Sequence, residues 1–148
     1  MKNLNQEDHY LETNTIEALE SDYLYIKSSL IKNAGKGLFT VIDIYKNEII
    51  SLFKGEIIAN KEADTRAQLK ADKYFINLLD GSIMDSMHTD CYAKYANDAK
   101  GISNSAFKNN AKITLDDNNN VCITALKKIK SGEEIFCSYG KRYWKKHS

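Results

Sequence analysis

A succession of short strand-like segments, broken by glycine, constrains the fold of this chain more than any other feature. Each segment is rich in β-branched and aromatic residues, as strands are. The first four segments are residues 23–31, 38–42, 48–53 and 56–59. Gly35, Gly37 and Gly55 lie at the breaks and predict turns.

The second half of the chain repeats this pattern around polar turns. Residues 74–85 predict two strands joined by a tight turn at Asp80 and Gly81. Residues 111–117 and 121–129 predict a hairpin closed by the asparagines between them. Beyond Gly132 the pattern predicts a turn, a short strand and a helical or irregular end. The fold is therefore expected to be mainly β, with few short helices.

Helix is expected at three further places. Residues 60–73 are rich in helix-favouring side chains, and Asn60 is a suitable N-cap. A short helical turn is expected over residues 91–95. Near the N-terminus Ile16 and Leu19 fall on one helical face, with acidic residues over much of the rest. We therefore predict a helical extension over residues 1–22, followed by a single domain over residues 23–148.

Length and composition limit the class of protein. The chain has 148 residues, which suggests one domain. Its composition is 43% hydrophobic, and its mean hydropathy of −0.49 fits a soluble globular protein. The net charge of +1 gives no overall attraction to nucleic acid, so no direct nucleic-acid site is expected.

The sequence also bears on the compartment. No apolar run approaches the roughly 20 residues that span a bilayer, so no membrane partner is expected. The first residues have no apolar stretch typical of a secretory signal. Cys91, Cys122 and Cys137 are odd in number and lack CxxC spacing, which favours neither disulfides nor a zinc site. These patterns predict an intracellular protein, without distinguishing nucleus from cytoplasm.

Four segments carry residues that bear on chemistry, although each is common on its own. They are NAGKGLFT at 33–40, Tyr74, AKYANDAKG at 93–101 with NNAKI at 109–113, and SGEEIFCSYG at 131–140. A glycine pair usually marks a plain turn, and this one lacks the pattern of a dinucleotide or phosphate loop. A single tyrosine is usually packing, and an Asn-Asp pair usually caps a turn. Their order is more informative than any one segment.

Taken in order, the four segments resemble the SET domain of protein-lysine methyltransferases. That family has a GxG loop near its start, an Asn-His-Ser segment, an Asn-Ala or Asn-Val strand, and a Gly-Glu-Glu-Leu strand ending in tyrosine. The resemblance covers about residues 24–144 and is loosest over residues 57–87. Asp98 and Ala99 replace the usual His and Ser. The family uses that stretch largely through backbone contacts with the cofactor and through the Asn side chain. The two replacements therefore weaken the match, but they do not abolish the implied role of this stretch in binding the cofactor.

The resemblance implies a SET-domain fold with several small sheets and a knot-like threading of the C-terminal segment. It corresponds to a minimal form of the family, without the cysteine-rich zinc segment and without any other metal site. The implied cofactor is S-adenosylmethionine, and the implied acceptor is a lysine side chain of a protein. The carried-over cofactor residues are Lys36, Gly37, Leu38, Tyr95, Asn97, Asp98, Tyr139 and Trp144. A core position for Trp144 is an equally weighted alternative.

The same resemblance assigns the catalytic side chains. Tyr139 matches the catalytic tyrosine, and Tyr74 matches a tyrosine that lines the lysine channel. Deprotonating a lysine of pKa about 10.4 at pH 7 costs roughly 4.6 kcal/mol. A sulfonium about 4 Å away repels the ammonium by about 4 kcal/mol at an effective dielectric of 20. The cofactor's charge can therefore do most of the deprotonation, and no histidine base is required.

Cys137 stands two residues before Tyr139, where the family commonly has Phe or Tyr and controls how many methyl groups are added. A cysteine side chain is smaller than Phe or Tyr, and its thiol hydrogen-bonds more weakly than a tyrosine hydroxyl. Our hypothesis is that the extra room permits di- or trimethylation of the lysine. The alternative is a small buried hydrophobe without influence on the product.

Two other functions remain open at this point. One is a non-catalytic SET-like module that binds a peptide or protein, supported by the altered Asn97-Asp98-Ala99 segment. The other is an unrelated β-rich interaction domain, which requires all four matches to be accidental. If the chain is an enzyme, the methyl acceptor could be a histone tail, a ribosomal protein or another protein. The predicted N-terminal helix also makes a homodimer a candidate assembly.

Overall fold

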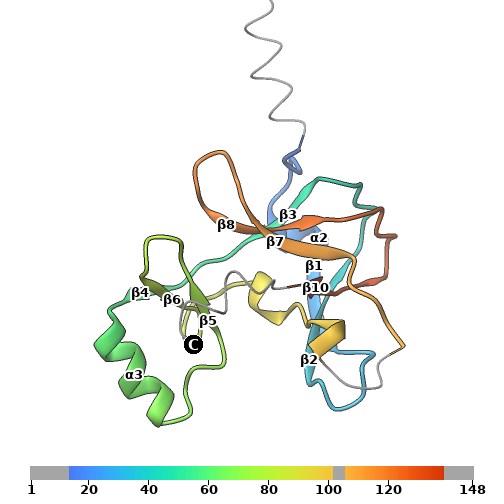
Figure 1. The fold of residues 1–148 in the computed structure, drawn as a ribbon. Helices are drawn as coiled ribbons and strands as arrows, with labels where there is room; N and C mark the ends of the chain where they lie inside the picture. The colour runs from blue at the N-terminus through green and yellow to red at the C-terminus, as the bar shows by residue number, and fades with distance from the viewer. Residues whose placement is uncertain (1–13, 102–105, 139–148) are drawn as a thin grey trace, which may run out of the picture.

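Three small sheets form the framework of the described residues (Figure 1). The structure is a computed structural model, and it describes residues 14–101 and 106–138. The first sheet has the order β1-β2-β9, all antiparallel. Its strands are β1 (Leu24–Ser28), β2 (Lys36–Thr40) and β9 (Glu134–Ile135). The expected mainly β architecture with several small sheets is confirmed.

The second sheet has the order β10-β7-β8-β3 and packs with the first around the main core. Its strands are β3 (Ile49–Leu52), β7 (Ala111–Leu115), β8 (Val121–Ala125) and β10 (Cys137–Ser138). The predicted β7–β8 hairpin is confirmed. Asp116 closes its turn by accepting hydrogen bonds from the backbone N–H groups of Asn118 and Asn120, both at 2.8 Å.

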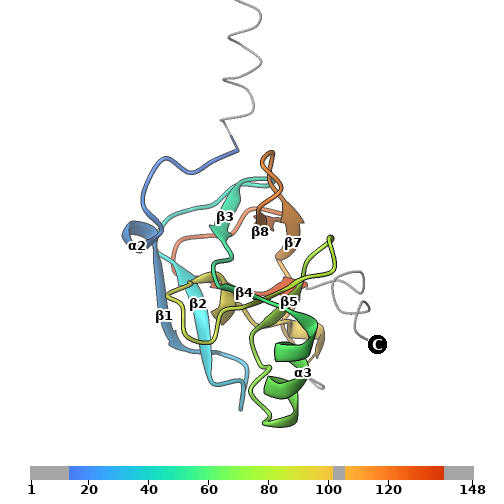
Figure 2. The same cartoon turned by 90° about the vertical axis from the view of Figure 1, so that its left-hand side faces the viewer.

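The third sheet and the longest described helix form a side lobe with its own small core (Figures 1 and 2). The lobe consists of β4 (Glu56–Ile58), α3 (Asn60–Gln68), β5 (Phe75–Asn77) and β6 (Ile83–Asp85), in sheet order β4-β6-β5. Arg66 of α3 holds the lobe together by pairing with Glu56 at 3.0 Å and with the buried Asp85 at 2.8 Å. These carboxylates raise the pKa of the Arg66 guanidinium.

Two details of α3 differ from expectation. The N-cap is Ala59, not Asn60, and no side chain caps the helix start. The helix also ends at Gln68, well before residue 73, because Lys70 adopts a left-handed conformation with φ of 61°. The N–H groups of Leu69 and Lys70 bond carbonyls of the last turn, which is a common way to close a helix.

The other helical elements in the described residues are single turns. They are α2 (Glu20–Tyr23), η1 (Ala93–Tyr95) and η2 (Ala99–Gly101). The helix expected through Ile16 and Leu19 is wrong for residues 14–19, which instead run beside β3. Thr15 forms a bridge with Ile49, and the Ile49 N–H donates to the carbonyl of Asn14 at 2.7 Å. Residues 1–13 lie outside the described part, so the proposed boundary near residue 22 stays a prediction.

The segment at 136–138 is held on two sides. Phe136 forms a parallel bridge with Asn97, and β10 pairs in parallel with β7 through Cys137 and Ala111. Residues 136–138 therefore lie between two segments from earlier in the sequence, while the expected knot-like threading stays a prediction because residues 139–148 lie outside the described part. Over the ranges described, no helix is both long and apolar enough to cross a bilayer.

Candidate functional site

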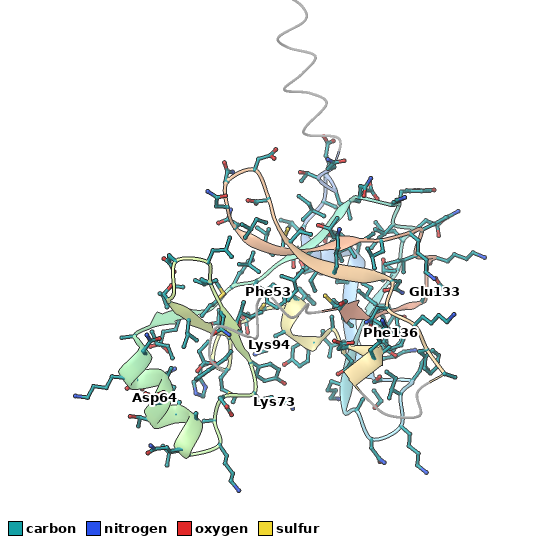
Figure 3. All side chains as sticks on the ribbon, in the orientation of Figure 1. Phe53, Asp64, Lys73, Lys94, Glu133 and Phe136 are labelled. Carbon is teal, nitrogen blue, oxygen red and sulfur yellow. The ribbon has the colours of Figure 1, made fainter. Side chains whose placement is uncertain are left out.

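A cavity of about 360 Å³ lies where the side lobe meets the main body. Figure 3 shows Phe53, Lys94 and Lys73 in this region, between α3 and the larger sheets. The lining combines apolar, aromatic and charged side chains from four separate parts of the sequence. The lining residues are Ala34, Lys36, Phe53, Lys73, Tyr74, Phe75, Ile76, Lys94, Tyr95, Ala96, Asn97 and Asp98. Five residues predicted from sequence, Lys36, Tyr74, Tyr95, Asn97 and Asp98, are thus brought together.

Asn97 joins three of the sequence motifs at this cavity. Its side-chain Nδ2 donates to the carbonyl of Lys36 at 3.0 Å, which ties it to the glycine loop. Its own carbonyl accepts a hydrogen bond from the backbone N–H of Cys137 at 2.8 Å, which ties it to the C-terminal motif. The side chain and backbone of one residue therefore fix the relative positions of segments far apart in the sequence.

The glycine loop is shaped by a buried carboxylate. Glu134, 2% exposed, accepts hydrogen bonds from the Ser29 hydroxyl at 2.7 Å and the Leu30 N–H at 2.8 Å. A Cβ atom at residue 37 would overlap the Glu134 carboxylate and stand 3.2 Å from Ser29 Cα. Gly37 is therefore needed for packing within the protein. It lies inside β2 with Leu38, whose side chain is fully buried in the core, and neither lines the cavity.

Two tyrosine rings and a lysine form one wall. The rings of Tyr74 and Tyr95 lie 6.3 Å apart and are tilted by 59°. The Lys94 ammonium lies 5.0 Å from the first ring centroid and 5.4 Å from the second. It also donates to the carbonyls of Ser86 at 2.9 Å and Thr89 at 3.2 Å. Such contacts hold the cation and the rings in a fixed arrangement.

Asp98 stands where the family has histidine, and its carboxylate is held by its neighbours. Its Oδ1 accepts hydrogen bonds from the Lys100 N–H and from Asn109 Nδ2, both at 2.9 Å. The same Asn109 accepts a bond from the Ala99 N–H at 2.8 Å. Asn109 thus secures the loop around the two unusual residues and keeps the backbone of this motif in place.

Cys137 lies fully buried in the main core and does not line the cavity. Burial raises the pKa of its thiol well above the ordinary value, and the negative charge of Asp98 raises it further. The thiol is therefore neutral at physiological pH. Tyr139 and Trp144 lie outside the described residues, so their proposed roles stay predictions.

Several contributors were not predicted from sequence. Phe53, 5% exposed, reaches the cavity from the end of β3, but its position before Lys54 and Gly55 resembles any strand end. Lys94 was overlooked because a lysine beside an aromatic residue is common. Asn110 was noted only as part of a motif, although it binds the C-terminal segment through both side-chain atoms. Its Nδ2 donates to the Glu134 carbonyl at 3.0 Å, and its Oδ1 accepts from the Phe136 N–H at 2.8 Å.

Comparison with known proteins agrees with this geometry. The sequence profile of the SET domain matches residues 35–140. Among similar solved structures is an apo Chaetomium thermophilum Polycomb Repressive Complex 2 with two mutations in Ezh2, at 27% identity and a TM-score of 0.69. Another is the same complex in an autoinhibited conformation bound to S-adenosylmethionine, at 26% identity and a TM-score of 0.67. A third is the complex bound to GSK126, at 26% identity and a TM-score of 0.69.

Each of the three alignments covers 84% of this chain but only 16% of the matched chain. The likeness therefore extends over one domain of much larger proteins. Within this chain, the profile match includes the glycine loop, Asn97, Asn110 and the Gly-Glu-Glu segment, all of which the structure connects. The chain belongs to the SET domain family.

Proposed function

We propose that this chain is a protein-lysine methyltransferase that uses S-adenosylmethionine. The observation that carries the proposal is the position of Asn97. This residue joins the glycine loop, the cavity and the segment that leads to Tyr139 through two hydrogen bonds. The bound S-adenosylmethionine of a similar solved structure supports the choice of cofactor.

The cavity residues fit this cofactor. Its volume of about 360 Å³ falls within the usual range of small-molecule sites. Its lining combines apolar and aromatic side chains with polar and charged groups that can orient a ligand, namely those of Lys36, Lys73, Lys94, Asn97 and Asp98. The rings of Tyr74 and Tyr95 already contact the Lys94 ammonium, which fixes this aromatic wall before any ligand binds.

The chain's own residues would position the reactants and keep water out. Lys36 and Asn97 would hold the amino acid end of the cofactor, while Tyr74 and Phe53 would wall the lysine channel. Bound S-adenosylmethionine would supply an electrophilic methyl group, whose carbon bonds to the lysine nitrogen as the carbon–sulfur bond breaks and leaves its electron pair on sulfur. Because only a neutral amine can accept the methyl group, the lysine ammonium would first release a proton to water. Tyr139 would orient the resulting amine, and the methylated lysine would leave as an ammonium.

The proposal extends to the acceptor only as a class. A lysine of an intracellular protein is the expected acceptor, and histones are the first candidates to test. The N-terminal residues 1–22 are proposed as an appendage to a catalytic domain over residues 23–148, with self-association as its proposed role.

The test incubates the chain with methyl-labelled cofactor and two separate acceptors, recombinant core histones and a ribosomal protein fraction. A Tyr139→Phe variant serves as the matched control. Label transfer that falls at least tenfold in the variant supports the proposal. Equal transfer by both proteins removes Tyr139 from its role. Cofactor binding without transfer to any acceptor favours a non-catalytic SET-like module instead.

A further inference from the structure

One charged residue of the cavity lining, Asp98, is negative, whereas the others are positive. Lys36, Lys73 and Lys94 supply positive charges, and Asp98 is the only carboxylate among the lining residues within the described ranges. Lys94 is turned toward backbone carbonyls, and Lys36 and Lys73 are exposed to solvent. Asp98 is half-buried, so its charge is less screened by water than the charges of the exposed Lys36 and Lys73. Lys94 is half-buried as well, but its ammonium donates its hydrogen bonds to backbone carbonyls.

We propose that Asp98 makes the site prefer the methyl donor over the demethylated product. This inference rests on the proposed function and concerns the same cavity. S-adenosylmethionine carries a sulfonium, an ammonium and a carboxylate, so its net charge is +1. S-adenosylhomocysteine lacks the sulfonium charge and is neutral overall. A nearby carboxylate therefore attracts the donor and leaves the product almost unaffected.

The carboxylate is well placed for this role. Its Oδ1 is fixed by the Lys100 N–H and Asn109 Nδ2, so the charge is ordered before any ligand binds. Its field also reaches Cys137, in the segment that leads to Tyr139. Burial is the main cause of the raised pKa of the Cys137 thiol, and the Asp98 charge adds to it, two residues before Tyr139.

The functional consequence is release from product inhibition. After each transfer the ligand in the cavity loses its positive charge, and its attraction to Asp98 falls with it. A histidine at this position, as in the family pattern, supplies no such negative charge. Asp98 thus acts as a specificity-determining residue that helps exchange product for fresh donor.

The test measures dissociation constants for the donor and for S-adenosylhomocysteine by isothermal titration calorimetry. The quantity of interest is the ratio of product to donor dissociation constants. Asp98→Asn keeps the Oδ1 acceptor for both hydrogen bonds while removing the charge. We expect it to lower the ratio about fivefold, mostly by weakening donor binding, as expected for one charge pair at intermediate dielectric. Asp64→Asn on α3, in the side lobe (Figure 3), is the matched control and should leave the ratio unchanged.

Two further measurements sharpen the result. Sinefungin carries an ammonium near the position of the sulfonium, so its affinity should fall with that of the donor in Asp98→Asn. In the unmodified protein, added salt should lower the ratio, because screening weakens the attraction to Asp98. If the lysines dominated instead, salt would raise the ratio. This measurement decides the question even if Asp98→Asn fails to fold.

The outcomes separate the two proposals. An unchanged ratio in Asp98→Asn, with both ligands weakened equally, overturns the inference but leaves the proposed function intact. A ratio of product to donor dissociation constants that rises with added salt also overturns the inference and leaves the proposed function intact. If the unmodified protein binds neither ligand, the proposed function fails and the inference falls with it.

Discussion

The Glu134 carboxylate occupies the space that a side chain at Gly37 would need. The two residues lie in adjacent strands, since β2 pairs with β9. Their contact links the glycine loop directly to the Gly-Glu-Glu segment. The two most recognisable sequence motifs are therefore complementary in shape, and each constrains the other.

Replacing Gly37 by alanine should destabilise the fold, because the new methyl group displaces the Glu134 carboxylate from Ser29 and Leu30. We expect a loss of about 2–3 kcal/mol in the free energy of unfolding, measured by urea denaturation. The control is the same substitution in a Glu134→Ala background, where the obstruction is gone. Equal losses in both backgrounds would show that Gly37 acts through something other than Glu134.

Asn110 should be one of the most sensitive polar residues in the chain. Asn110→Ala leaves the Phe136 N–H and the Glu134 carbonyl without their side-chain partner in a buried setting. The expected loss is about 2–4 kcal/mol in unfolding free energy. Asn118→Ala, in the exposed β7–β8 turn, should change it by less than about 0.5 kcal/mol. A small loss at Asn110 would mean that the C-terminal segment is held mainly by its strand pairing.

Tyr23 should contribute to stability at neutral pH and lose that contribution in alkali. Its hydroxyl donates to the Ile50 carbonyl at 2.6 Å. Burial, with the charges of Glu20 and Glu48, raises the pKa of the phenol above its ordinary value of 10.0. The folded state therefore holds this proton more tightly than the unfolded state. The stabilisation is complete below about pH 10 and decreases as the pH rises further.

Urea midpoints measured between neutral and strongly alkaline pH would check this. Tyr23→Phe removes the ionisable group, so its unfolding free energy should decline less steeply above about pH 10. At neutral pH the variant should be less stable by about 1 kcal/mol, from the lost hydrogen bond. Identical alkaline slopes in both proteins would show that Tyr23 does not govern the alkaline response.

Cys137 is expected to control how many methyl groups a lysine receives. Cys137→Phe restores a large side chain two residues before Tyr139, and we expect mass spectrometry of a saturated reaction to shift toward monomethyl-lysine. The unmodified chain should give di- or trimethyl-lysine. Because Cys137 is fully buried, the variant will also lose about 1–3 kcal/mol by overpacking. Cys137→Ala is the control for packing, and the hypothesis fails if the unmodified chain yields only monomethyl-lysine.

Sequence patterns predicted the hairpins and turns whose backbone conformation depends on residues close together in the sequence. The β7–β8 hairpin and the turn at Asp80 follow from local turn chemistry, and both are present. The resemblance to the SET domain named Lys36, Tyr74 and Asn97, and all three line one cavity, while their roles stay predictions.

Sequence reasoning failed where distant contacts decide the outcome. The amphipathic pattern near Ile16 suggested a helix, but pairing of Thr15 with Ile49 favours an extended path. The resemblance names Gly37 as a cofactor residue, but the need for glycine there is also set by packing against Glu134, nearly one hundred residues later. Lys94 gains its contacts from the loop after β6, which no local pattern reveals.

The double pairing of residues 136–138 has a consequence for biosynthesis. This segment lies between Asn97 and β7, so the site cannot close until the ribosome has delivered residues 136–138. The β7–β8 hairpin can form earlier, while residues 136–138 are still inside the exit tunnel. Until those residues emerge, the nascent chain carries an open, incomplete site. Its ability to recognise a ligand begins only when residues 136–138 have paired on both sides.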